Sequence, residues 1–213
     1  AAGANTLVLA VKPQVMRPVC EALADIVQRD KPLVISNAAG TRIGQIERWL
    51  GGDVAVVRAM PNTPALVGAG AAGLCANARV GAGQRTRAEH IMDAAGLAVW
   101  IEREELMDVV TALSGSGPAY FFLLVEALED AAVALGLPRD AARALATQTC
   151  LGAGRMLRED GEAPGRLRER VTSPGGTTQA ALESFAASGL REIVARAVAA
   201  AAQRGRELSA AGG

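Results

Sequence analysis

The first half of the chain alternates short apolar runs with segments of helical period. The apolar runs are bounded by charged residues, prolines or glycines, which is typical of strands buried on both faces of a parallel sheet. They lie at Thr6–Val11, Leu33–Ile35, Val54–Met60, Ala71–Cys75 and Leu97–Trp100. Apolar residues recur at helical spacing in Gln14–Arg29, Arg42–Leu50 and Gln84–Ala95, and Thr41 is a candidate cap for the second of these helices. This order predicts an α/β sheet of the parallel type with right-handed crossovers.

The carboxyl ends of the first three predicted strands carry mostly small residues. They are Ala10–Pro13, Asn37–Gly40 and Met60–Asn62. Ligands bind outside these ends in open α/β sheets, so we expect the three segments to line one rim. Small side chains let a flat ligand approach the backbone, which makes this rim a candidate cofactor edge.

After residue 102 the pattern is helical almost to the end of the chain. Helices are predicted at 106–113, 119–137, 139–158, 164–170, 179–187 and 190–208. The stretch Ser114–Tyr120, SGSGPAY, interrupts this pattern, and Ser116 is a candidate N-cap with Pro118 in the following first turn. A helix N-terminus there would attract anions. The stretch has no Gly-Lys-Ser/Thr and follows a helix, so a turn joining the two halves is favoured, with Ser114 and Ser116 at most in a pocket wall.

A second loop, Val171–Thr178, combines a turn with two threonines. Pro174, Gly175 and Gly176 form the turn, and Thr177 and Thr178 stand at the start of the next helix. Their hydroxyls and the unpaired backbone N–H groups form a candidate carboxylate site. An ordinary capped turn between two helices has the same signature, so the residues leave both interpretations open.

Charge and composition exclude several classes of partner. In 213 residues Lys+Arg and Asp+Glu are equal at 22 each, and aromatic residues make up 3%. Balanced charge argues against a nucleic-acid or anionic-membrane surface, and so few aromatics argue against base stacking. Cys20, Cys75 and Cys150 are far apart, which favours neither a disulfide framework nor a zinc site and fits a reducing cytoplasm. Charged residues interrupt the longest apolar stretches, so no transmembrane helix is expected.

Other candidates for chemistry are weaker. Lys12 follows a strand, where it either pairs with a phosphate or is solvated, and the second is favoured. MPNTP at 60–64 either holds a cofactor or is a turn bounded by prolines. No Ser/His/Asp set, carboxylate pair or His/Cys cluster has the placement of a triad or a metal site, so hydrolase and metalloenzyme functions have little support.

Six motifs, in this order, closely resemble those of the pyrroline-5-carboxylate reductase family, which catalyses the last step of proline synthesis. They are LAVKPQ at 9–14, SNAAG at 36–40, RAMPNTP at 58–64, VTALSGSGPAYFF at 110–122, LPRDAA at 137–142 and VTSPGGTT at 171–178. The resemblance covers nearly the whole chain. LAVKP and NTP are shared more loosely with other dehydrogenases.

The resemblance implies a Rossmann-like domain over 1–102 and an all-α dimerisation and substrate domain over 103–213. It implies NADPH or NADH as cofactor, a small imino acid as substrate, no metal, and a homodimer that in many members assembles into a decamer. Carried over residue by residue, the cofactor contacts are Ala10, Val11, Lys12, Pro13, Ala38, Ala39, Met60 and Asn62. The substrate contacts are Ser173, Thr177, Thr178 and Glu104, and Thr178 is expected to orient the ring nitrogen or relay its proton.

One departure from the family pattern concerns the start of the chain. The family begins with further βα units and a GxGxxG-type turn, whereas this sequence opens at what resembles the fourth strand of the family. The resemblance therefore implies an incomplete Rossmann-like domain whose front strands are missing. We expect cofactor binding by these residues to be impaired, and the preference between NADH and NADPH is not encoded in them.

Two other functions compete with this interpretation. One is a two-domain dehydrogenase of the β-hydroxyacid type, which usually places a catalytic lysine in its helical domain. This chain has no lysine after Lys31, which disfavours that class. The other is a non-catalytic helical dimerisation fragment, which the alanine-rich helices would support.

Overall fold

The structure of the protein is a computed structural model that describes residues 1–211. Residues 212 and 213, which end the predicted helical domain, lie outside the described residues. The backbone divides into two compact units, one of residues 1–118 with the segment from Val198 onward, the other of Ala119–Ala197. The predicted domain boundary between residues 102 and 103 stays a prediction.

A five-stranded sheet with the order β1-β2-β3-β4-β5 forms the centre of the first unit. Its strands are β1 (Thr6–Leu9), β2 (Leu33–Ser36), β3 (Val56–Met60), β4 (Gly70–Ala76) and β5 (Gly96–Trp100). β1, β2 and β3 are parallel, but β4 runs antiparallel to β3, so the predicted parallel sheet is wrong at β4. Only the short turn η1 (Thr63–Val67) lies between them, and a parallel crossover needs roughly a dozen residues or more.

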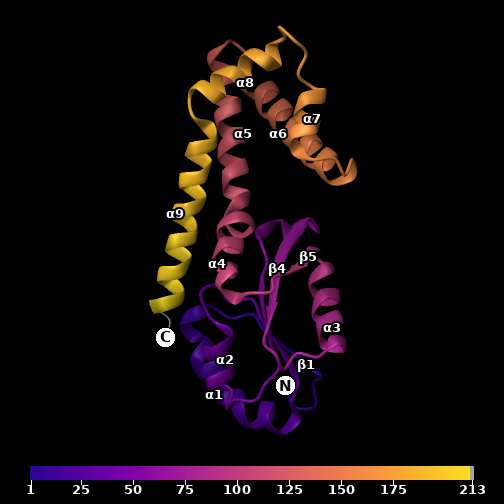
Figure 1. Cartoon of the computed structure of the whole chain (residues 1–213), viewed down its shortest axis with the longest axis vertical. Coiled ribbons are helices and arrows are strands. Elements are labelled where there is room, and N and C mark those ends of the chain that lie inside the picture. The colour runs from indigo at the N-terminus through magenta and orange to yellow at the C-terminus, as the bar shows by residue number, and fades with distance from the viewer. Residues whose placement is uncertain (212–213) are drawn as a thin grey trace. The chain divides into compact units, whose positions relative to one another are not determined.

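Helices cover both faces of this sheet. α1 (Pro13–Asp30) and α2 (Ile43–Trp49) pack on one face and α3 (Ala82–Asp93) on the other (Figure 1). Because side chains of a strand alternate between faces, Val56 of β3 joins the α1 and α2 side and Val57 joins the α3 side. Arg58 has the same parity as Val56, which directs it toward the α1 and α2 side.

The start of α2 differs from the sequence expectation. Thr41 is buried and does not cap the helix, because Arg42 occupies the cap position. The Gln45 side chain accepts a hydrogen bond from the Arg42 N–H at 2.7 Å, and Glu104 Oε1 accepts one from the Ile43 N–H at 2.7 Å. These two acceptors satisfy the first free amides of the helix, so a threonine cap is not needed.

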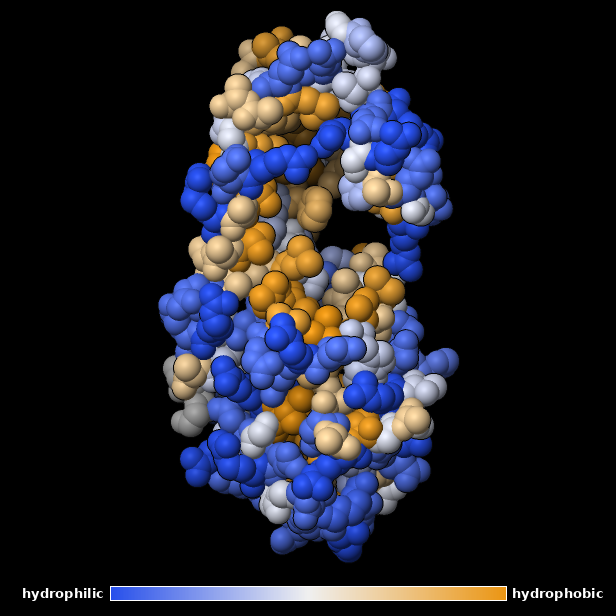
Figure 2. Space-filling model, viewed as in Figure 1, coloured by the Kyte–Doolittle hydropathy of each residue, from blue (hydrophilic) through white to orange (hydrophobic). Residues whose placement is uncertain are grey.

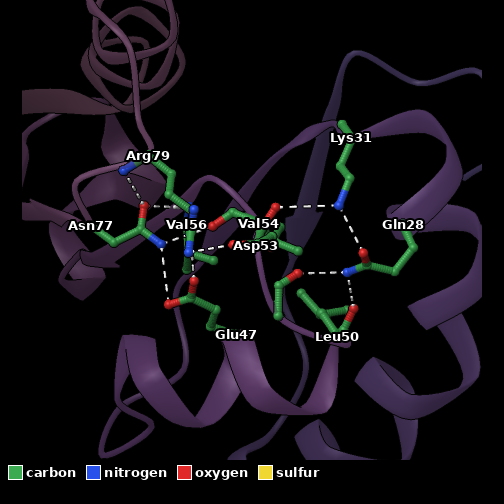
Figure 3. Close-up of polar contacts among 10 residues, drawn as sticks. Gln28, Lys31, Glu47, Leu50, Asp53, Val54, Val56, Asn77 and Arg79 are labelled. Carbon is green, nitrogen blue, oxygen red and sulfur yellow. Dashed lines mark hydrogen bonds and ion pairs between the residues drawn. The ribbon is translucent and has the colours of Figure 1, made fainter.

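A polar network closes the sheet at the amino ends of its central strands (Figure 3). Gln28 at the end of α1 donates from Nε2 to the carbonyls of Leu50 and Gly52, both at 2.7 Å. Asn77 after β4 donates to the Val54 carbonyl at 2.8 Å and accepts from the Val56 N–H at 3.2 Å. These side chains fix the loop that leads into β3, since they satisfy backbone groups that no strand pairs.

The SGSGPAY stretch is helical, so the predicted turn there is wrong. After η2 (Glu104–Leu106) and α4 (Met107–Val110), a π-helical segment, η3 (Thr111–Gly115), leads into α5 (Gly117–Ala134). Ser116 has helical φ and ψ of −84° and −22° and is not an N-cap, and its N–H donates to the Thr111 carbonyl at 2.8 Å. Gly115 therefore ends a π segment, and Gly117 and Pro118 begin α5 directly after it.

The second unit consists of helices. It holds α5 from Ala119, α6 (Arg139–Glu159), α7 (Pro164–Arg170), α8 (Thr177–Ala187) and the first turns of α9 (Leu190–Ala211). Gly136, with φ +100°, ends α5, and Glu129 then binds Arg139 at 2.8 Å and Arg143 at 2.9 Å. The hydrogen bond from Arg143 lowers the pKa of Glu129, so this α5–α6 contact is ionised at neutral pH.

The Asn77 contacts predict a measurable loss of stability. Asn77→Ala should lower the free energy of unfolding by about 1–3 kcal/mol, because the Val54 carbonyl and the Val56 N–H lose their partner. Urea unfolding followed by circular dichroism measures this difference. Thr86→Ala on the exposed face of α3 is the control, and equal midpoints for the two variants would contradict the role of Asn77.

Candidate functional site

The carboxyl ends of β1, β2 and β3 form one edge of the sheet, as the sequence predicts. Leu9 pairs with Ser36, and Ser36 pairs with Arg58, so the three strands end at nearly the same level. Lys12 and Pro13 follow β1 at the start of α1, where both side chains are exposed. Ala10 is also exposed and Val11 is half-buried, so this segment presents backbone and a cation at the rim.

The loop after β2 contributes backbone rather than side chains to the rim. Ala38 is 4% exposed and belongs to the core, whereas Ala39 is exposed. Gly40 has φ +75°, a left-handed conformation that favours glycine. A ligand at this rim therefore meets the peptide groups around Ala39, without a bulky side chain in its way.

The loop after β3 is held by the side chain of Asn62. Its Oδ1 accepts from the Ala71 N–H at 2.9 Å, and its Nδ2 donates to the Ser114 carbonyl at 3.0 Å. In a regular helix that carbonyl would accept from residue 118, but proline has no N–H. Asn62 thus supplies the donor that Pro118 lacks. The cofactor contact predicted for Asn62 stays a prediction. In the structure, both polar atoms of its side-chain amide are bound to backbone groups of the first unit.

Met60 lies beside the same π segment. A Cβ added at Gly115 would lie 2.9 Å from Met60 Cε, so only glycine fits against this methionine without a shift. Met60 itself is half-buried. The end of β3 and the helix that carries SGSGPAY are therefore packed together within the first unit, and this contact fixes where Met60 stands at the rim.

A buried ionic cluster lies below the rim. Arg58 is 2% exposed, and its Nη1 lies 3.3 Å from Glu104 Oε1 while its Nη2 lies 3.7 Å from Asp108 Oδ1. Ser209 near the end of α9 donates to Asp108 Oδ1 at 3.1 Å. Glu104, predicted as a substrate contact, is thus bound to Arg58 and to the Ile43 N–H, and its contact with substrate stays a prediction.

Neither a reactive thiol nor a metal cluster stands beside these residues. Cys75 pairs with Arg58 across β3 and β4, and burial, with the nearby charge of Glu104, raises the pKa of its thiol. Burial likewise raises the pKa of Cys20 to about 11. Within residues 1–211, no group of three His, Cys, Asp or Glu side chains could hold a metal ion. Both thiols therefore remain protonated at neutral pH.

The VTSPGGTT loop of the second unit forms a tight turn before α8. The Gly176 N–H donates to the Ser173 carbonyl at 3.0 Å, and Gly175 has φ +70°. Helix α8 begins at Thr177, so the first amides of the helix have no partner along the helix itself. Ser173 and Thr177 are exposed and Thr178 is half-buried, so the loop brings three of the four predicted substrate residues together beside free N–H groups.

The helical unit also exposes much apolar surface along α5 (Figure 2). Its exposed side chains include Phe121, Phe122, Leu123, Leu124 and Leu128. In the described part of the chain, one helical stretch, Glu104–Ala134, is long and apolar enough to cross a membrane by length and composition, although helices in soluble proteins can also meet this test. Six acidic residues interrupt it, and two of these, Glu104 and Asp108, lie in the cluster around Arg58.

An α/β unit with a rim of small residues at its strand ends, followed by a helical unit with free amides at the start of α8, is the arrangement expected of a two-unit nicotinamide-dependent oxidoreductase. A family model described as pyrroline-5-carboxylate reductase dimerisation matches residues 104–208. A pyrroline-5-carboxylate reductase from Pseudomonas aeruginosa is 50% identical over 208 residues, which cover 98% of this chain and 76% of the relative. The chain belongs to the pyrroline-5-carboxylate reductase family.

Solved structures agree with this assignment. A pyrroline-5-carboxylate reductase from Coxiella burnetii superposes with a TM-score of 0.95 at 49% identity, covering 98% of this chain and 77% of that chain. The enzyme from Plasmodium falciparum, solved with NADP bound, gives a TM-score of 0.84 at 33% identity, covering 96% and 77%. The Rossmann-like and helical fold class predicted from the sequence is confirmed.

Sequence reasoning missed the cluster of Arg58, Asp108 and Ser209. One signal was present, because an arginine inside the apolar strand VVRAM has to find a buried partner. The partners themselves could not be found from the sequence, since Asp108 and Ser209 are 101 positions apart.

The Asn62 geometry predicts an energetic coupling to Pro118. Asn62→Ala should destabilise the protein by about 1–3 kcal/mol, because the Ser114 carbonyl and the Ala71 N–H lose their partner. In the Pro118→Ala background residue 118 can donate to Ser114, so the same substitution should cost about 1 kcal/mol less. A double-mutant cycle of urea unfolding measures the difference, and additive losses would rule out this role of Asn62.

Proposed function

We propose that this chain reduces 1-pyrroline-5-carboxylate to L-proline with NADPH or NADH, the final step of proline synthesis. The substrate is a cyclic imine with a carboxylate, so the reaction needs an anion site, one hydride at the imine carbon and one proton on the ring nitrogen. The observation that carries the proposal is the loop before α8, which combines free amides with the hydroxyl side chains of Ser173, Thr177 and Thr178.

The Thr177–Thr178 end of α8 binds the substrate carboxylate. Free N–H groups at a helix N-terminus and the positive end of the helix dipole favour an anion. Ser173 lies one turn earlier in the same loop, and its backbone carbonyl is already bound to the Gly176 N–H. The Thr178 hydroxyl orients the ring nitrogen or relays its proton, and the reduced rotational freedom of the bound imine provides much of the rate.

The rim of the first unit fits a nicotinamide cofactor in shape and charge. Ala10, Ala39 and Gly40 leave the backbone open to a flat ligand, and exposed Lys12 offers a cation to a phosphate. When bound, the cofactor supplies the hydride. The residues Val11, Pro13, Ala38, Met60 and Asn62 shape this rim, Ala38 through its backbone and Asn62 by holding the loop after β3.

A second copy of the chain covers the apolar surface of the helical unit. The exposed side chains of α5 would be costly in water, and the matched family model describes dimerisation. The assembly is a homodimer, which can associate further into a decamer. A protein of this kind, with three free cysteines, works in the cytoplasm without a membrane partner.

Thr178→Ala tests the substrate loop. Consumption of NADPH and formation of proline are measured with 1-pyrroline-5-carboxylate at varied concentration. We expect kcat/KM for the imine to fall by about tenfold or more, because the hydrogen bond between the Thr178 hydroxyl and the ring nitrogen is lost in the transition state. The KM for NADPH should stay unchanged.

Ser184→Ala on an exposed position of α8 is the matched control, because it deletes a hydroxyl from the same helix outside the loop. Unchanged kinetics for Thr178→Ala would remove Thr178 from the mechanism. An oligomeric chain that consumes no NADPH would contradict the proposed activity and favour a helical dimerisation fragment.

Phe122→Glu tests the assembly. Phe122 is 67% exposed on α5, and a buried unpaired carboxylate is costly, so the variant should shift the protein toward the monomer. Analytical ultracentrifugation gives the masses in solution. Val15→Glu on α1, where the wild-type side chain is 46% exposed, is the control and should assemble normally. Equal masses for Phe122→Glu and the wild type would place the interface elsewhere.

A further inference from the structure

A chain of buried polar contacts joins the last turns of α9 to the loop that carries Ala38 and Ala39. It runs from Ser209 through Asp108, Arg58 and Glu104 to the first amide of α2. All of these residues belong to the first unit. Ser209, Asp108 and Arg58 have no direct role in the reduction proposed above. Their role in the protein is therefore a separate question.

At one end of this chain of contacts, α9 lies tightly against α4. Ser209 is 2% exposed and Asp108 is 5% exposed, and the Ser209 hydroxyl donates to Asp108 Oδ1 at 3.1 Å. A Cβ at Gly205 would lie 3.3 Å from the Cβ of Asp108, so glycine at this position allows the close approach. The end of α9 thus packs closely against α4 and belongs to the α/β unit.

In the middle, Arg58 is a buried cation between two carboxylates. Among the described residues its Nη2 has no hydrogen-bond partner, and the oxygen that faces it is Asp108 Oδ1 at 3.7 Å. Since burial of a charge is tolerated only when its partners stay in place, the position of Asp108 matters to Arg58. Ser209 holds the same oxygen, so α9 fixes the carboxylate that neutralises the guanidinium.

At the other end, the loop after β2 is held at two points. Glu104 Oε1, which faces Arg58 Nη1 at 3.3 Å, accepts a hydrogen bond from the Ile43 N–H at 2.7 Å. Three residues earlier in the loop, a Cβ at Gly40 would lie 3.7 Å from the backbone of Leu208 and Ser209. The segment 37–43 is therefore bounded by α9 on one side and by the ionic cluster on the other.

We propose that Ser209, Asp108 and Arg58 are positioning residues for the cofactor rim, because they hold the segment 37–43 in the conformation that presents the backbone of Ala38 and Ala39. The last turns of α9 are then part of the cofactor site without touching the cofactor. The inference rests on the proposed function for the identity of the ligand, but the restraint on the loop is a property of the chain alone.

Hydrogen–deuterium exchange of the Ser209→Ala variant tests this restraint without any need for activity. Loss of the hydroxyl frees Asp108 and loosens Arg58 and Glu104, so amides in 37–46, including that of Ile43, should exchange about tenfold faster than in the wild type. Amides of α3, which packs on the face of the sheet opposite α1 and α2, should keep their protection. Glu207→Gln, which breaks only the exposed ion pair with Arg204 on the same helix, is the matched control and should change neither region.

Two exchange results would overturn the proposal: unchanged protection of 37–46, or an equal increase across the whole first unit, which would mean a general loss of stability. A kinetic measurement gives the functional part. In Ser209→Ala the KM for NADPH should rise several-fold while the KM for the imine stays the same, and equal KM values for NADPH would overturn the role at the rim. Failure of the proposed activity is recognised separately, because the wild type would then consume no NADPH while the exchange result still stands.

Discussion

The buried guanidinium of Arg58 is the constraint on which the α/β unit depends. A cation that is 2% exposed inside a sheet has to be neutralised, and the carboxylates that do so come from η2 and α4, immediately after the last strand. Their placement in turn requires α4 to pack on β4, Glu104 to accept from the first amide of α2, and Ser209 of α9 to donate to Asp108. One arginine in a strand therefore orders four other elements around the rim.

A second constraint arises from Pro118. A helix that passes through SGSGP loses one backbone donor, and the fold replaces it with Asn62 from the loop after β3. The same amide accepts from Ala71 at the start of β4, so the helix defect and the loop between β3 and β4 are fixed by one side chain. Together the two constraints explain why the rim has a defined shape although its own residues are small and make few contacts with their side chains.

The sequence predicts most elements because their apolar patterns are strong, and α7 at Pro164–Arg170 has the predicted bounds. It fails where a local signal has two physical solutions. Two glycines and a proline predict a turn at 114–118, yet a π segment that ends at Gly115 leads directly into α5, and Asn62 supplies the donor that Pro118 lacks. An apolar run predicts β4 but not its direction, which the short η1 connection decides. Likewise Thr41 predicts a cap, but Gln45 and Glu104, the second distant in sequence, take over that role.

For the candidate site, too, the sequence predicts what is local and not the contacts between residues that are distant in sequence. The rim and the loop before α8 can be found from the sequence because each is local, a strand end in one case and a helix start in the other. The periodicity of α9 predicts a helix but carries no information about its partners, because the face toward Asp108 is built from Gly205 and Ser209 rather than from large apolar residues. Gly205 and Ser209 give no recognisable pattern in the sequence. In the packed interior they matter to the free energy of folding, because glycine allows the close approach to Asp108 and the serine hydroxyl donates to its buried carboxylate. The conformation of the rim loop therefore depends on residues far from it in sequence, and this dependence is visible only once the fold brings them together.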